Sequence, residues 1–305
     1  MDLGIALPTA APYTSPDAII QVAQAAEDLG YTAVWTYERL LYALGDIPQP
    51  GGPPRPLPSS YKSVYEPIDT LTFVAAKTKA VRLGTSVIVA PFHVPVVLAR
   101  RLATLDQLSG GRVIAGLGLG WMRQEYIAAG VPMARRGARL EEFIAALRAA
   151  WAPDPVWFEG EFYNIPPSEI NPKPVQEGGI PIVIGAFAPA AIERAGRIAD
   201  GYNPIARGLD SLRQQVESFR EAAEKADRDP AQLKVMVRAN VSITSRPAGA
   251  GGRDFLSGAP EQVAEDLLAL QDLELDHVFF NNLTAKSADE NIKLMERLQA
   301  AFSRS

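Results

Sequence analysis

The sequence predicts a closed (β/α)8 barrel of the TIM-barrel class, formed by residues 1–305 as a single domain, and three observations support this. The chain has 305 residues, of which 47% are hydrophobic and 21% charged, an ordinary composition for a globular protein of barrel size. Short apolar runs alternate with longer amphipathic stretches, as in a parallel sheet that is buried on both faces. Eight such runs interleave with helical patterns, which favours a closed barrel over an open sheet.

The apolar runs set the expected strands, and the patterns between them set the expected helices. The expected strands cover residues 3–7, 32–36, 82–89, 112–117, 182–184, 201–203, 234–241 and 277–280. The first helix begins near Ser15, a capping residue followed by Pro16, and stops at Gly30. Further helices are expected near residues 67–80, 95–108, 189–199, 209–226, 260–273 and 288–302, with another helical pattern before residue 152.

Two segments break this alternation and are expected to be insertions. Residues 45–58, after the second strand, are too rich in proline and glycine for a helix or an interior strand. Loops that follow barrel strands lie at the catalytic face, so this segment is a candidate substrate lid, with a disordered surface loop as the equal alternative. Residues 152–176, between the fourth helix and the fifth strand, are expected to form a small ordered excursion over one end of the barrel.

Charge and residue counts exclude several classes of function. A net charge of −5 gives no electrostatic reason to expect nucleic acid or an anionic membrane as a partner. The absence of cysteine excludes disulfides, thiolate catalysis and cysteine metal sites. The two histidines, His93 and His277, lie far apart in the sequence and outside any metal-binding pattern, so no metal is expected. The amino terminus lacks the pattern of a secretion signal, and a cytoplasmic protein is expected.

Two glycine-containing segments at strand ends could let a ligand approach the backbone. Gly116, Gly118 and Gly120 end the fourth strand with a spacing that differs from the dinucleotide-binding pattern, and a tight turn at the catalytic face is the alternative. Residues 184–189 pass from the fifth strand into a helix through small residues. Backbone amides at the start of a helix can bind an anion such as phosphate.

Polar residues at strand ends are candidates for moving protons or orienting a ligand. They are Glu38 and Arg39 after the second strand, Arg123, Gln124 and Glu125 after the fourth, and Arg238 and Asn240 in the seventh. Helix capping and salt bridges are the alternative roles for each of them.

Three stretches together resemble the luciferase-like monooxygenase superfamily. They are LGTSV at residues 83–87, LARRLATLDQLSGGRVIAGLGL at 98–119, and PIVIGAFAPAAIERAGRIADGY at 181–202. Within the superfamily, GIALPT at residues 4–9 and AEDLGYTAVWTYERLL at 26–41 resemble the branch that uses the deazaflavin coenzyme F420.

The resemblance implies a cofactor site at the catalytic face, for coenzyme F420 or alternatively FMN. It implies a non-proline cis peptide between Ser86 and Val87 that supports the central ring of the cofactor from behind. It also implies a phosphate held by the amides of the turn after the fifth strand. The further positions that match the family's cofactor site are Gly118, Gly120, Trp121, Gly185, Ala186, Phe187 and Ala188.

The sequence departs from the family's F420-dependent sugar-phosphate dehydrogenase. Glu38-Arg39 stands where many F420-dependent members have aspartate and histidine, and a guanidinium keeps its proton near neutral pH, so Arg39 cannot be a general base. Trp121 replaces the glutamate that serves as the proton donor. We expect an F420-dependent reductase of a small organic substrate, with Glu38 and Arg39 as catalytic residues and Tyr61 or Tyr65 as other proton donors.

Two other functions remain open for the same barrel. One is an FMN-dependent monooxygenase, and the other is a non-catalytic barrel that only binds flavin. The resemblance also implies a homodimer or homotetramer, since family members commonly assemble in these ways. A small-molecule substrate is expected, with neither nucleic acid nor a membrane as a partner.

Overall fold

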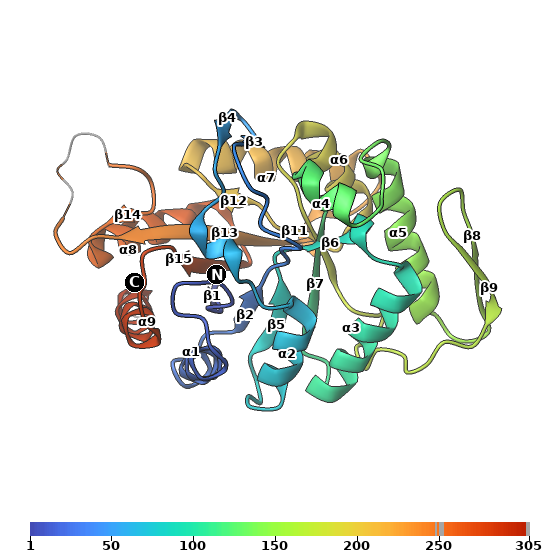
Figure 1. The fold of residues 1–305 in the computed structure, drawn as a ribbon, viewed down its shortest axis with the longest axis horizontal. Coiled ribbons are helices and arrows are strands. Elements are labelled where there is room, and N and C mark those ends of the chain that lie inside the picture. The colour runs from blue at the N-terminus through green and yellow to red at the C-terminus, as the bar shows by residue number, and fades with distance from the viewer. Residues whose placement is uncertain (248, 250–252, 303–305) are drawn as a thin grey trace.

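The computed structural model describes residues 1–247, 249 and 253–302, and it confirms the predicted barrel (Figure 1). Within these residues, eight parallel strands form a ring in which the last strand pairs with the first. In ring order they are β1 (Asp2–Ala6), β2 (Ala33–Thr36), β5 (Arg82–Thr85), β7 (Val113–Gly118), β10 (Ile182–Gly185), β11 (Gly201–Tyr202), β13 (Lys234–Ile243) and β15 (His277–Asn282). Two short strands extend this sheet beside β13, namely β12 (Ile205–Ala206) and β14 (Ser257–Gly258).

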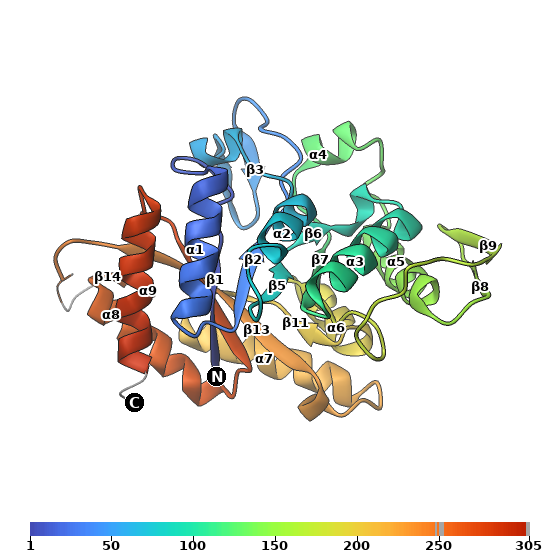
Figure 2. The same cartoon turned by 90° about the horizontal axis from the view of Figure 1, so that it is seen from below.

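Helices follow the strands and cover the outside of the ring (Figure 2). They are α1 (Pro16–Asp28), α2 (Pro67–Ala75), α3 (Pro95–Ser109), α4 (Arg123–Ala128), α5 (Arg136–Trp151), α6 (Pro189–Ile198), α7 (Leu209–Glu224), α8 (Pro260–Ala269) and α9 (Ala288–Phe302). The short α4 was not expected from the sequence. As expected, Ser15 caps α1 by accepting a 3.1 Å hydrogen bond from the N–H of Ala18. No helix in the described part of the chain has the length and apolar character needed to cross a membrane.

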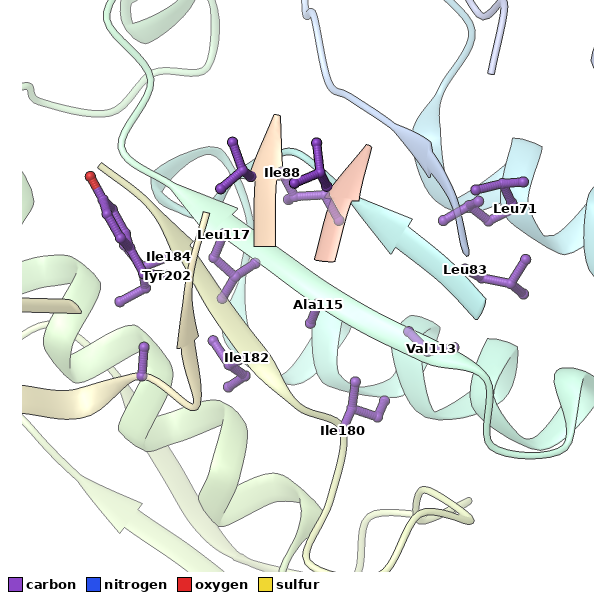
Figure 3. Packing of buried hydrophobic residues seen from close by; sticks show 14 of the residues in the cluster. Leu71, Leu83, Ile88, Val113, Ala115, Leu117, Ile180, Ile182, Ile184 and Tyr202 are labelled. Carbon is purple, nitrogen blue, oxygen red and sulfur yellow. The ribbon is translucent and has the colours of Figure 1, made fainter. Parts of the chain in front are cut away.

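The main hydrophobic core lies between the strands and the helices. Figure 3 shows Ala115 and Leu117 of β7 beside Ile182 and Ile184 of β10 in this layer. These four side chains are at most 1% exposed. Burying an isoleucine or leucine side chain contributes about 1.5–3 kcal/mol, so this layer fixes the positions of the strand ends that carry the site.

The second helix ends earlier than the sequence suggested, at Ala75 and not near residue 80. Two side chains from elsewhere in the chain bind the segment that follows it. The carboxylate of Glu27 accepts hydrogen bonds from the N–H groups of residues 79–81. The guanidinium of Arg112 donates to the carbonyls of Ala75, Thr78 and Val81. These bonds compete with helical ones, and a local pattern could not reveal them.

The expected strand 82–89 is interrupted. It consists of β5 and of β6 (Ile88–Val89), which pairs with β7, and the residues Ser86 and Val87 lie between them. The hydroxyl of Thr85 donates to the carbonyl of Gly116 at 2.8 Å and accepts from its N–H at 2.9 Å. A Cβ at Gly116 would collide with the carbonyl of Thr85, so glycine is required here for close packing.

The insertion after β2 contains a β-hairpin, so the alternative of a disordered surface loop is wrong. Its strands are β3 (Ile47–Gln49) and β4 (Gly52–Arg55), which pair with each other apart from the barrel, and a 3-10 helix follows at Ser59–Lys62. Ile47 and Leu57 are buried against Met122, with Trp121 beside them. This packing places the insertion over the end of β7, at the catalytic face.

The second insertion does not lie over an end of the barrel, which corrects the expectation. Its strands β8 (Val156–Glu159) and β9 (Asn164–Ser168) form a hairpin beside α5 in both views (Figures 1 and 2). The carboxylate of Glu142 on α5 accepts hydrogen bonds of 2.6 Å from the N–H groups of Phe162 and Tyr163. These hydrogen bonds hold the hairpin against the outer side of α5.

Candidate active site

Side chains fill the lower part of the barrel, so a ligand site can exist only above them. Trp35 and Phe279 stack with ring centroids 4.4 Å apart, and Nε1 of Trp35 donates a 3.0 Å hydrogen bond to Nε2 of His277. Gly4 and Gly84 make room for this layer, because a Cβ on either would collide with the ring of His277 or Trp35. Burial lowers the pKa of His277 to about 3, so its imidazole is neutral and packs as part of the core.

Above this layer, polar side chains from opposite sides of the ring meet across the mouth. The hydroxyl of Ser86, after β5, donates a 2.7 Å hydrogen bond to Oδ1 of Asn203, which follows β11. Arg238 on β13 donates from Nη1 to the carbonyl of Ser86 at 3.2 Å and from Nε to Oδ1 of Asn240 at 3.1 Å. These residues form a polar floor at the C-terminal face, where barrel enzymes build their active sites.

Val87 connects this floor to two further strands. The peptide between Ser86 and Val87 is cis, as the resemblance predicted. A Cβ on Gly118 would lie 2.5 Å from Cγ2 of Val87, and a Cβ on Gly185 would lie 2.7 Å from its Cγ1. The packing of a side chain therefore requires both glycines, a role that the sequence did not suggest.

Glu38 is held at the rim by both of its carboxylate oxygens. Oε2 accepts a 2.6 Å hydrogen bond from the N–H of Val89, and the N–H of Glu38 donates to the carbonyl of Val87 at 3.2 Å. Its side chain thus extends the pairing between β2 and the segment after β5. Oε1 lies 2.8 Å from Nε2 of His93, and the two side chains are 10% and 19% exposed. The result is a carboxylate–imidazole pair that can hold a proton near the mouth.

Arg39 lies between two aromatic rings and pairs with a buried carboxylate. Its Nη1 donates to Oε2 of Glu125 at 2.9 Å, and its guanidinium carbon lies 4.7 Å from the ring centre of Tyr61 and 5.6 Å from that of Trp121. The other oxygen of Glu125 accepts from the N–H of Leu40 at 2.8 Å. Burial raises the pKa of Glu125 more than Arg39 lowers it. The pair fastens the segment after β2 to α4.

The turn between β10 and α6 combines backbone donors with a nearby cation. The helix begins at Pro189, and no side chain caps it. Among the residues that the structure describes, the N–H groups of Phe187 and Ala188 have no hydrogen-bond acceptor. The guanidinium carbon of Arg207 lies 4.4 Å from the ring centre of Phe187, a side chain that is 53% exposed. Unbonded amides at a helix start, beside a guanidinium, fit a phosphate group.

A family model described as luciferase-like monooxygenase matches residues 1–253, well over half of the chain. The chain belongs to this family. A relative of this luciferase-like protein, named F420-dependent glucose-6-phosphate dehydrogenase 1, comes from Rhodococcus jostii strain RHA1. The two are 36% identical over 185 residues, which cover 58% of this chain and 54% of the relative.

Solved structures match the luciferase-like fold over nearly the whole chain. One is described as an F420-dependent secondary alcohol dehydrogenase in complex with an F420-acetone adduct. Its TM-score is 0.80 at 16% identity, over 98% of both chains. Another is the monooxygenase RslO1 from Streptomyces bottropensis, with a TM-score of 0.79 at 21% identity, over 100% of this chain and 99% of that one. At these identities the likeness establishes the fold and leaves the chemistry open.

The luciferase-like barrel brings most of the predicted site residues to one face. Glu38, Arg39, Ser86, Val87 and Trp121 lie around the mouth, and the turn after β10 begins at the same face. Gly120, whose φ is +64°, would place a Cβ 2.8 Å from Cγ1 of Val89, so it packs beside the residue that binds Glu38.

Sequence reasoning did not single out three residues that the structure places at the mouth or at the turn after β10, namely His93, Asn203 and Arg207. Asn203 is the last residue of the expected strand 201–203 and could have been found from that position. His93 lies 55 positions from Glu38, so no local pattern could have paired them.

Proposed function

We propose that this protein is an F420-dependent oxidoreductase that transfers a hydride between the deazaflavin C5 and a small organic substrate, acting as a reductase. The observation that carries the proposal is the turn at Phe187 and Ala188, whose unbonded amides lie beside Arg207 and fit a phosphate. Both F420 and FMN contain a phosphate. The relative that is named F420-dependent, together with the sequence at residues 26–41, favours F420.

The bound cofactor would supply the hydride-carrying carbon, and the chain would supply its placement. The amides of Phe187 and Ala188 would hold the phosphate. Ser86 and Val87 would support the ring system. The remaining cofactor contacts would come from Gly118, Gly120, Trp121, Gly185 and Ala186. Arg238 and Asn203, which bond to Ser86, would hold that residue in place beneath the cofactor site.

Reduction of an electron-poor double bond or imine is proposed over oxidation of a sugar phosphate, because Arg39 and Trp121 stand where the sugar-phosphate dehydrogenase has its histidine and glutamate. Hydride addition leaves an electron pair and a negative charge on the acceptor, which must then take a proton. The pair of Glu38 and His93, with 2.8 Å between Oε1 and Nε2, can hold that proton. Arg39, which is already neutralised by Glu125, would orient the substrate.

A titration of the purified protein with each cofactor tests the proposal. Oxidised F420 is expected to bind more tightly than FMN by at least about tenfold, a difference of about 1.4 kcal/mol. Reduced F420 is then expected to be oxidised without oxygen when an enone or an imine is added. Tight binding of FMN with no binding of F420 would overturn the proposal.

The competing function is an FMN-dependent monooxygenase, favoured by the solved structure of a monooxygenase that has the same fold. Oxygen consumption separates the two, because the deazaflavin hydride carrier reacts poorly with oxygen. Substrate-dependent oxygen uptake with reduced FMN would support the monooxygenase. Hydride transfer to any acceptor in the screen would exclude a barrel that only binds flavin.

A further inference from the structure

Arg238 occupies a central place in the polar floor. Its strand, β13, is seventh in the ring of eight and faces β5, the third, across the barrel. The guanidinium nevertheless reaches the carbonyl of Ser86 at 3.2 Å, so it spans the mouth. Its carbon lies 5.4 Å from the ring centre of Tyr37, a residue whose pKa burial raises to about 12. The phenol of Tyr37 therefore stays neutral and does not balance the charge.

No carboxylate balances the charge of Arg238. Within the part of the chain that the structure describes, no acidic oxygen lies within 4.0 Å of its nitrogens. Arg39, the other guanidinium of the mouth, is neutralised by Glu125 at 2.9 Å. Burial disfavours the charged form and lowers the pKa of Arg238. A partly buried cation without a counter-ion is costly unless a ligand supplies the negative charge.

Arg238 also has an unused donor. It makes two hydrogen bonds to protein groups, from Nε and Nη1, while Nη2 has no partner among the described groups and is not fully buried. Arg112 shows how the same chain treats a structural arginine. Its guanidinium makes five hydrogen bonds to backbone and hydroxyl oxygens. The protein therefore uses two of the five N–H donors of the Arg238 guanidinium.

Two asparagines fix the direction of the open donors. Oδ1 of Asn240 accepts from Nε of Arg238 at 3.1 Å and from Nδ2 of Asn281 at 3.2 Å. Because this oxygen is occupied twice, the donor that Asn240 keeps open is its NH₂ group, which bonds to no other group in the described part of the chain. The amide and the guanidinium together offer donors for an oxygen that accepts more than one hydrogen bond, as carboxylate and enolate oxygens do.

We propose that Arg238 and Asn240, positioned by Asn281, form a binding site for an anionic oxygen on the floor of the mouth. The site takes a carboxylate or a delocalised enolate-type oxygen, carried either by the substrate or by the ring system of the cofactor. The assignment deepens the proposed function and rests on the same mouth being the ligand site. If the substrate supplies the anion, the preferred substrates would be those that carry an acidic group next to the reducible bond.

Binding of benzoate and of its neutral counterpart benzamide tests the site directly. The binding is measured on the full chain by ligand-observed NMR or calorimetry. The wild type is expected to bind benzoate more tightly than benzamide. Arg238→Gln should weaken benzoate binding by roughly tenfold or more and leave benzamide unchanged. Arg238→Lys, which keeps the charge and loses the forked geometry, should lie between them. Arg213→Gln, at an exposed position on α7, is the matched control and should bind like the wild type.

Repeating the titrations with coenzyme F420 separates the sources of the anion. If benzoate still binds the F420-loaded protein in an Arg238-dependent way, the substrate supplies the anion. If F420 itself binds about tenfold more weakly to Arg238→Gln, the cofactor supplies it. Arg238-dependent benzoate binding without any F420 binding would keep the anion site and reject the F420 proposal. Equal binding of benzoate and benzamide, with F420 affinity unchanged in Arg238→Gln, would overturn the anion site.

Discussion

The side chain of Val87 occupies the space that a Cβ on Gly118 would need. The separation between that Cβ and Cγ2 of Val87 would be 2.5 Å, well inside van der Waals contact, and Gly185 is excluded from a side chain in the same way at 2.7 Å. Glycines of β7 and β10 thus pack against one valine, which lies in the segment after β5. This explains why two of the three stretches that resemble the family carry glycine at positions 118 and 185.

Gly118→Ala should therefore displace Val87 and destabilise the protein. Overpacking of this kind costs about 1–3 kcal/mol, measurable by urea unfolding. Val87→Ala should rescue the change in a double variant, because the next groups near that Cβ, Cβ of Val87 and the carbonyl of Gly185, lie at 3.5 and 3.6 Å. Gly52→Ala is the control, since its nearest contact would be an ordinary 3.8 Å to Gln49. Additive effects of Gly118→Ala and Val87→Ala would contradict the packing relationship.

The architecture of the barrel followed from local patterns, and the chemistry of its mouth did not. Apolar runs and helix starts such as Ser15-Pro16 are encoded within a few residues, so the eight barrel strands and most of the helices could be read directly. The end of α2 depended on Glu27 and Arg112, which lie far away in the sequence. Such long-range side-chain bonds override local propensity.

Site residues could be predicted where the end of a strand determines their position. They could not be predicted where a bonding partner far away in the sequence determines it. Glu38 and Arg39 follow β2, so their position at the mouth was clear. Their partners His93 and Glu125 became visible only in three dimensions. Gly118 was predicted to contact the cofactor, and the structure shows that it accommodates the side chain of Val87. In a sequence, a glycine looks the same whether it accommodates a ligand or a neighbouring side chain.

Glu125→Gln should strongly destabilise the segment after β2. The substitution leaves Arg39 without its counter-ion in a place where the two side chains are 10% and 2% exposed. Removing one partner of such a buried pair costs about 3 kcal/mol, measurable by thermal or urea unfolding. Glu161→Gln breaks a pair with Arg135 whose side chains are 58% and 59% exposed, and it should leave stability unchanged. Equal effects of the two substitutions would show that burial does not control the Arg39 pair.

His277 should make the protein less stable as the pH falls below about 6.5. Its pKa is lowered to about 3 in the folded state, so between pH 6.5 and 3 the unfolded chain binds more protons at this position. Stability from this group is present above pH 6.5 and is lost on acidification. At about pH 4.5 the loss amounts to about 2.7 kcal/mol, from two pH units at 1.36 kcal/mol each.

His277→Gln removes this titration and keeps an acceptor for Nε1 of Trp35. Urea unfolding at pH 7 and 4.5 should therefore show a smaller acid-induced loss in the variant than in the wild type. The comparison uses the pH dependence and not the absolute stability, so the contribution of the carboxylates, which both proteins share, cancels. The same loss in both proteins would mean that His277 titrates normally in the fold.

Arg207→Gln should weaken the binding of coenzyme F420 by roughly fivefold, because the guanidinium lies beside the amides that fit the phosphate. Binding of a deazaflavin that lacks the phosphate should not change, and raising the salt concentration should reduce the difference between variant and wild type. Arg213→Gln, on α7 and exposed, is again the matched control. If the phosphate-free deazaflavin were affected equally, Arg207 would act on the ring system or on the fold.

His93→Gln should slow hydride transfer and change its pH profile while leaving F420 affinity unchanged. The imidazole lies 2.8 Å from Oε1 of Glu38, whose other oxygen is held by the N–H of Val89, so the pair can hold a proton in a fixed place. Loss of a general acid lowers the rate on the order of a hundredfold. Stopped-flow oxidation of reduced F420 by an enone, recorded across pH, measures both effects. Tyr61→Phe and Tyr65→Phe test the competing donors in the same assay. If a tyrosine variant removed the pH dependence and His93→Gln only lowered stability, the proton would come from the segment that follows the insertion, and the role of His93 would be to hold Glu38.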